Sequence, residues 1–174
     1  MLFRLAINII LKTVIKMLKK IKYYVIGILI PVAIGGLSAL LTRGDMDIYK
    51  DVAMPPFAPP AILFPIAWSI LYVLMSVSSV MVLLEKSVPF SDKAKAFLYY
   101  FLSLCVNFLW NIIFFKLRAF FACFILILIL LFLIIKTIIE YIKINKIAAY
   151  LQIPYALWVT FAAILNFSVW YLNR

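Results

Sequence analysis

Ala119–Ile139 reads AFFACFILILILLFLIIKTII, a continuous apolar run whose one charged residue, Lys136, stands close to its end. A helix needs about 20 mostly apolar residues to cross the hydrocarbon core of a membrane. The apolar residues do not alternate with polar ones, as they would in a strand of a membrane β-barrel. The run therefore predicts a transmembrane helix.

Further runs share this length and apolar character, namely Tyr24–Leu41, Ala61–Leu84, Ala94–Phe115 and Ile147–Leu172. The connections between the runs are polar, basic or proline-rich. Backbone N–H and C=O groups in lipid must be satisfied within each spanning segment, which a helix does by itself. The sequence therefore predicts an all-α membrane protein, a bundle of five transmembrane helices.

The composition supports this class. Of the 174 residues, 68% are hydrophobic and 13% are charged, whereas soluble domains have roughly 45–50% apolar and ~25% charged residues. A soluble fold of this size could not bury that much apolar surface, so a soluble enzyme, a disordered regulator and a secreted disulfide scaffold are excluded. The chain has no histidine, which excludes a Ser-His-Asp triad, a histidine metal cluster and an axial haem histidine.

The net charge is +11, from 17 Lys+Arg and 6 Asp+Glu. The basic residues stand at the ends of the apolar runs, so the expected partner is the lipid bilayer with its anionic lipids and not nucleic acid. With five spans, one side receives Arg4, Lys12, Lys16, Lys19, Lys20, Lys22, Lys86, Lys93, Lys95, Lys136, Lys143 and Lys146. The other side receives Arg43, Lys50, Lys116, Arg118 and Arg174. The excess of basic residues on the first side predicts a cytoplasmic N-terminus.

The frequent use of Ile, Lys, Phe and Tyr is typical of an AT-rich bacterial genome, so we expect a bacterial cell membrane.

The first 22 residues form a separate segment, followed by the five-helix domain at residues 23–174. Lys12, Lys16 and Lys19 share one helical face, the other face holds Ile10, Val14, Met17 and Ile21, and the segment has no acidic residue. This pattern predicts an amphipathic arm that lies on an anionic membrane surface. The alternative is that native synthesis starts at Met17, in which case residues 1–16 are absent from the native protein.

Proline is concentrated in the first long loop, residues 42–60, which contains Pro55-Pro56-Phe57-Ala58-Pro59-Pro60. Proline fixes φ and favours extended geometry in the residue before it. We expect a semi-rigid loop that caps an internal pocket, or else a stiff connector that only starts the second helix. Pro31 and Pro154 lie inside apolar runs, where each is expected to kink its helix.

Aromatic and polar side chains recur at helical spacing in three of the predicted helices. These stripes are Pro65, Trp68, Tyr72 and Ser79; Asn107, Trp110 and Asn111; and Tyr155, Trp158, Ala162 and Asn166. Lipid penalises polar groups, so each stripe is expected to face the bundle interior. Two interpretations stay open. The stripes form interhelical hydrogen bonds and packing contacts, or they line one cavity that suits a flat, largely apolar ligand.

The sequence contains no recognisable catalytic constellation. The six acidic residues lie in loops or at helix ends, and none is placed for acid–base catalysis or for ion-driven transport. A Gly-rich phosphate loop and a CxxC motif are also absent. We therefore expect no catalytic residue, no metal site and no required cofactor.

Three motifs occur in a fixed order along the chain. The first comprises Ile48-Tyr49, Met54–Pro60 and Phe64–Tyr72, the second is Leu104–Phe115, and the third comprises Pro154–Trp158, Phe161-Ala162 and Leu165-Asn166. Together they resemble the TspO/MBR family, the tryptophan-rich sensory proteins related to the translocator protein or peripheral benzodiazepine receptor. The resemblance extends over about residues 17–174. The chain departs from it at Ile48 and Ile62, where many members have tryptophan.

The resemblance implies a five-helix membrane receptor or carrier, often a homodimer, with a pocket between helices one, two, three and five beneath the first loop. The implied ligands are porphyrins, haem-like tetrapyrroles and synthetic benzodiazepine- or isoquinoline-type compounds. Carried over by motif, the ligand-binding residues are Tyr49, Trp68, Tyr72, Asn107, Asn111, Phe114, Pro154, Trp158 and Ala162, with Asn107 and Pro154 in supporting roles.

Two other functions stay open. Some members of the family are linked to light-dependent porphyrin breakdown, and the tryptophans involved match Trp68 and Trp158, which would then be the reactive residues. The other alternative is a structural membrane scaffold, in which the three stripes only pack the helices together.

Overall fold

The computed structural model describes residues 2–43 and 51–174, and within these ranges the ordered elements are all helices. The elements are α1 (Leu2–Thr42), α3 (Leu63–Leu84), α4 (Phe90–Phe115), α5 (Phe120–Ile144), α6 (Lys146–Tyr150) and α7 (Ile153–Leu172). In the described part of the chain, five segments are long and apolar enough to span a membrane, and α6 and α7 together form the fifth. The predicted fold class is thus confirmed.

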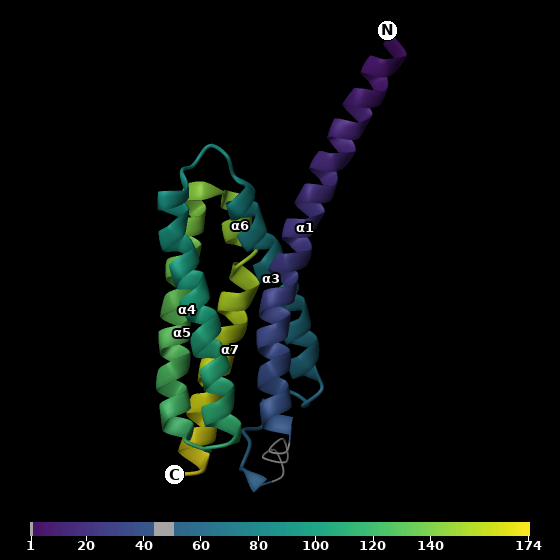
Figure 1. Cartoon of the computed structure of the whole chain (residues 1–174). Helices are drawn as coiled ribbons and strands as arrows, with labels where there is room; N and C mark the ends of the chain where they lie inside the picture. Colours follow the sequence, from purple (N-terminus) through teal and green to yellow (C-terminus); the bar gives the residue numbers. More distant parts are fainter. Residues whose placement is uncertain (1, 44–50) are drawn as a thin grey trace.

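The helices close into a ring. Helix α1 packs against α3 and α4, α4 packs against α5, α5 packs against α6 and α7, and α3 completes the ring through α6 and α7. The two ends of the chain lie at opposite ends of the bundle (Figure 1). The ring leaves a shared interior, toward which α3, α4, α5 and α7 each direct one face. The orientation of this bundle in the membrane stays a prediction.

Helix α1 is longer than a bilayer requires. Its 41 residues continue without interruption through Pro31, which gives a length of about 60 Å against a hydrocarbon core of about 30 Å. The N-terminal half projects beyond the other helices and leans away from them (Figure 1). All side chains from Leu11 to Tyr23 are exposed. The placement of this arm on a membrane surface stays a prediction.

The fifth span is broken, where the sequence predicted a kink. Helix α6 ends at Tyr150 and α7 begins at Ile153, with Pro154 in its first turn. The N–H groups in the first turn of a helix have no intrahelical acceptor. Proline lacks an N–H group, so its presence at position 154 removes no hydrogen bond from the helix. The backbone of the intervening turn is satisfied by Leu151 and Gln152, whose N–H groups donate to the carbonyls of Ile147 and Ala149.

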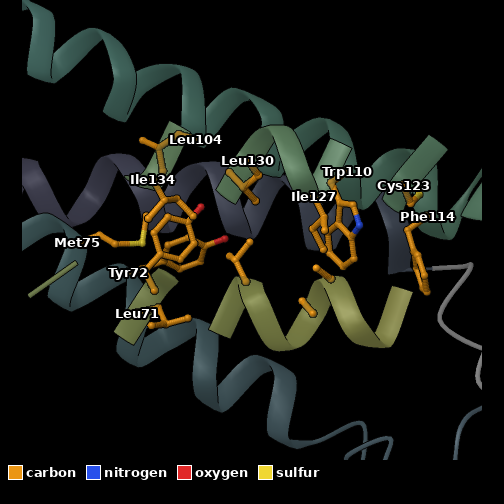
Figure 2. Packing of buried hydrophobic residues seen from close by; sticks show 14 of the residues in the cluster. Leu71, Tyr72, Met75, Leu104, Trp110, Phe114, Cys123, Ile127, Leu130 and Ile134 are labelled. Atoms are coloured by element: carbon orange, nitrogen blue, oxygen red, sulfur yellow. The ribbon is translucent and has the colours of Figure 1, made fainter. Parts of the chain in front are cut away.

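Large side chains fill the interior of the ring. Tyr72 and Met75 of α3 turn toward Ile134 of α5, and Trp110 of α4 lies beside Ile127 (Figure 2). Helix α3 approaches α4 and α7 mainly through such side chains, since its backbone has few close neighbours on either of them. The space between these helices is therefore occupied by aromatic rings and not by backbone contacts.

Buried polar groups connect α3 to the fifth span near α6 and to the end of α5. The Ser78 hydroxyl donates to the Ala148 carbonyl at 2.6 Å and accepts from the Gln152 amide at 3.2 Å. Ser79 and Tyr141 share a hydrogen bond of 2.9 Å between their hydroxyls. Hydrogen bonds between membrane helices each stabilise a bundle by about 0.6 kcal/mol on average. These contacts hold the helix ends opposite the first loop.

Candidate functional site

A small cavity lies between α3, α4, α5 and α7. Its walls are Phe64 and Trp68 from α3, Asn107 and Trp110 from α4, Ile127 and Leu130 from α5, and Trp158, Val159 and Ala162 from α7. The remaining open space is about 10 Å³, room for about one water molecule. Sites for drug-sized ligands measure roughly 300–1,000 Å³, so the cavity as described has no room for a ligand of that size.

Aromatic rings close the cavity by packing against one another. The Trp68 ring lies 5.4 Å from Tyr72 and 6.0 Å from Tyr155, measured between ring centroids. Across the cavity, Trp158 meets the edge of Phe64 at 5.8 Å. Aromatic pairs at such separations each contribute about 0.5–1.5 kcal/mol beyond their buried area. A flat ligand that enters here would replace ring–ring contacts by contacts of the same kind.

Asparagine side chains supply the polar groups of the site. The Trp110 indole N–H donates to Asn166 Oδ1 at 3.2 Å, and Asn166 Nδ2 donates to the Ala162 carbonyl at 2.9 Å. Asn111 Nδ2 donates to the Asn107 carbonyl at 3.2 Å. In contrast, Asn107 is 1% exposed and its Oδ1 atom has no hydrogen-bond partner among the described residues. An unsatisfied buried polar group is unfavourable by about 1–3 kcal/mol, so this atom is a candidate contact for a ligand.

The structure brings together four of the predicted site residues, Trp68, Asn107, Trp158 and Ala162, at the wall of one cavity. Three others lie behind this wall. Tyr72 packs on Trp68, the Phe114 ring stacks on Trp110 at 5.4 Å, and Asn111 bonds to the backbone of Asn107.

The last two predicted residues lie elsewhere. Pro154 is exposed in the first turn of α7 and is not part of the cavity wall. Tyr49 lies outside the described residues.

The helices that form the wall also differ from the expected set. Helix α1 contributes none of the wall residues, while α5, the fourth span, contributes Ile127 and Leu130. These two residues stand in a uniform aliphatic run that carries no sequence signal for a site. Phe64 was missed as well, although its position four residues before Trp68 places it on the same helical face.

The first loop is attached to the bundle at the cavity end. Ala53 forms two backbone hydrogen bonds of 3.0 Å with the side chain of Asn173, which follows α7. Asp51 accepts from Arg118 at 3.0 Å in an ion pair whose members are both about half exposed. The Phe57 ring meets Phe161 at 6.5 Å, and Phe161 in turn contacts the cavity residue Trp158. A continuous row of rings thus leads from the loop to the cavity.

Comparison with known sequences identifies the family of the chain. The sequence profile of the TspO/MBR family matches residues 27–172. The chain is 36% identical over 143 residues to the protein CrtK of Rhodobacter capsulatus, covering 80% of this chain and 85% of CrtK. It is 35% identical to the tryptophan-rich protein TspO of Archaeoglobus fulgidus, covering 86% of this chain and 95% of that protein. It is also 30% identical to the translocator protein of Bos taurus, covering 84% and 87% of the two chains. The match covers the C-terminal part of α1, the first loop and the other four spans, and the chain belongs to the TspO/MBR family.

Proposed function

We propose that this membrane protein is a receptor or carrier for flat, largely apolar ligands of the tetrapyrrole class, which it binds between α3, α4, α5 and α7. Isoquinoline- and benzodiazepine-type compounds would occupy the same site. The observation that carries the proposal is the meeting of Trp68 and Trp158, from separate spans, at one cavity that also contains Asn107. Two indole faces can stack on a macrocycle, and the unpaired Asn107 oxygen can accept a hydrogen bond from an O–H or N–H group on a substituent of the ligand.

Binding requires the cavity to open, because the closed space of about 10 Å³ is far below the roughly 300 Å³ of a small ligand site. The polar loop contacts are exposed or partly exposed, and exposed ion pairs stabilise a structure by only about 0–1 kcal/mol. Lifting the loop would free Phe57 from Phe161 and allow Trp158 to turn. We therefore assign the loop a gating role for the cavity.

A titration of the purified protein in detergent with protoporphyrin, followed by quenching of tryptophan fluorescence in the dark, tests the proposal. We expect saturable quenching and competition by an isoquinoline carboxamide. Quenching that rises linearly without saturation would contradict a binding site and favour a structural scaffold. Illumination of the bound complex adds a second readout, since formation of a new absorbing product would assign light-dependent conversion of the ligand.

The gating role predicts a kinetic effect of Asn173→Ala. This change removes both hydrogen bonds to Ala53, which together contribute about 1–3 kcal/mol at 0.5–1.5 kcal/mol each. We expect the association and dissociation rates of protoporphyrin both to rise, by about tenfold, with little change in Kd. Stopped-flow quenching measures both rates.

Ser168→Ala is the control for this prediction. Among the described residues its hydroxyl bonds within α7, to the Ile164 carbonyl at 2.9 Å, and it takes no part in the loop contacts. Equal rates for the two variants would show that the loop does not limit ligand entry.

A further inference from the structure

A larger hollow lies at the opposite end of the bundle from the first loop. It measures about 440 Å³, within the range of roughly 300–1,000 Å³ that small-ligand sites occupy. Its walls are the loop Ser87–Pro89, the start of α4 and the end of α5. In Figure 1 this loop arches over the end of the bundle between α3 and α4. We call the hollow the arch pocket.

Charged groups of both signs line the arch pocket. Glu140 of α5 forms two ion pairs, one between its Oε1 atom and Lys95 Nζ at 3.1 Å and one between its Oε2 atom and Lys143 Nζ at 2.8 Å. The Glu140 side chain is 11% exposed, whereas the two lysines are about 60% exposed. Each ammonium has three N–H donors and gives one to Glu140, so the remaining donors are available to a ligand. The two lysines and Glu140 together therefore carry a net charge of one positive unit.

Asp92 lies in the first turn of α4 and adds a negative charge to the same wall. Its carboxylate accepts a hydrogen bond of 3.3 Å from Ser91. The hydroxyls of Ser87 and Ser91 line the pocket as well. The backbone N–H groups at the start of the 26-residue helix α4 add partial positive charge at this position. The arch pocket therefore presents donors and two ammonium groups together with a separate carboxylate.

The arch itself is ordered by local hydrogen bonds. Glu85 Oε1 accepts from the Ser87 hydroxyl at 2.9 Å and from the Lys86 N–H at 3.1 Å. The hydrogen bonds from Ser87 hold the pKa of Glu85 below its ordinary value. Lys93 is buried and its ammonium donates to the carbonyls of Leu83 and Glu85 at the end of α3. A ligand would thus meet a preformed pocket and would not have to order the loop.

We propose that the arch pocket binds a phosphoethanolamine group, with its phosphodiester beside Lys95 and Lys143 and its ammonium beside Asp92. The pocket lies where the span α4 begins and the span α5 ends, and the ends of membrane-spanning helices are where lipid head groups are met. A purely anionic phosphate would offer Asp92 no cationic partner and would be repelled by its carboxylate. A choline group has no N–H donor for the carboxylate, so it forms no charge-assisted hydrogen bond there. The charges thus select a zwitterion with a primary ammonium.

Native mass spectrometry of the full-length protein, exchanged into an equal mixture of phosphatidylethanolamine, phosphatidylglycerol and phosphatidylcholine with identical acyl chains, tests this proposal. We expect phosphatidylethanolamine to be retained about tenfold over phosphatidylcholine, which corresponds to one charge-assisted hydrogen bond. The double variant K95Q/K143Q should lose this preference. The matched control is K86Q/K146Q, which removes the same charge from exposed residues at the same end that do not line the pocket.

Asp92→Asn separates ligand recognition from structural support, because the carboxylate bonds only to Ser91 among the contacts described. This variant should retain phosphatidylglycerol at least as well as phosphatidylethanolamine, a reversal that loss of folding would not produce. Competition by soluble O-phosphoethanolamine would assign recognition to the head group alone, and its failure to compete would assign it to the intact lipid. Equal retention of the three lipids by the wild type, or equal behaviour of the two double variants, would overturn the proposal.

Discussion

Trp158→Ala is expected to weaken protoporphyrin binding by about 1 kcal/mol or more, roughly a fivefold or larger increase in Kd. The indole lines the cavity and packs against Phe64 and Phe161 at 5.8 Å on each side. Its removal deletes one of the two indole faces available for stacking on a macrocycle. The equilibrium titration of fluorescence quenching in detergent measures the change.

Trp170→Ala provides a matched control for this experiment. Trp170 is also half-buried on α7 and also packs against two aromatic rings, those of Phe121 and Phe167. It does not line the cavity. Each variant removes one of the chain's 4 tryptophans, so the fluorescence signals are comparable. If the two variants bind protoporphyrin with the same affinity, the cavity is not the site.

The second large effect is expected for Gly35→Ala, which should destabilise the protein by about 1–3 kcal/mol, as overpacking of a filled interior does. A Cβ atom on Gly35 would stand 2.6 Å from Cζ and Oη of Tyr72. An aromatic ring is rigid and cannot move aside as the end of a flexible side chain can. Tyr72 is also only 9% exposed, and its ring packs on Trp68. The ring must shift, and Trp68 must shift with it. Thermal unfolding in detergent measures the stability, and the titration with protoporphyrin measures the effect on the cavity.

The neighbouring residue is the natural control. A Cβ atom on Gly36 meets nothing within 4 Å in the described structure, so Gly36→Ala should not lower stability, since alanine favours a helix more than glycine does, and it should leave binding unchanged. The double variant G35A/Y72L should lose less stability than the sum of its single changes, because the leucine gives way to the new methyl group. Equal unfolding temperatures for Gly35→Ala and Gly36→Ala would contradict the close packing of α1 on α3.

These results would place two functions at opposite ends of one bundle. The aromatic cavity beneath the first loop is the proposed ligand site, and the arch pocket at the other end is the proposed contact with a lipid head group. Helix α3 is common to both, since Trp68 near its start lines the cavity and Leu84 at its end precedes the arch. The buried bonds of Ser78 and Ser79 lie between them.

The number and type of the spanning helices could be predicted from the sequence because they depend on local properties. An apolar run of sufficient length must form a helix in lipid wherever its neighbours lie. Helical spacing also directed Trp68, Asn107 and Trp158 toward the interior, since residues four apart share a face. These three residues do meet at one cavity.

Which residues of a shared helical face line the cavity depended on the tertiary structure. Asn107 and Asn111 are equivalent in spacing, yet only Asn107 lines the cavity, because the Asn111 amide turns back to the backbone carbonyl of Asn107. Likewise Pro154 breaks the fifth span and does not merely bend it, since the chain turns at Leu151 and Gln152 before α7 begins.

Composition and apolar run length thus determined that this chain crosses a membrane five times, and its motifs determined the family. Only the tertiary structure decided that α5 and not α1 completes the cavity wall, that the rings close it almost entirely, and that Lys95 and Glu140 meet in a second pocket. The physical reason is that the hydrogen bonds and the apolar face of a helix are formed by residues that are close together in the sequence. Contacts between helices depend on how side chains distant in sequence share one volume, and no single segment contains that information.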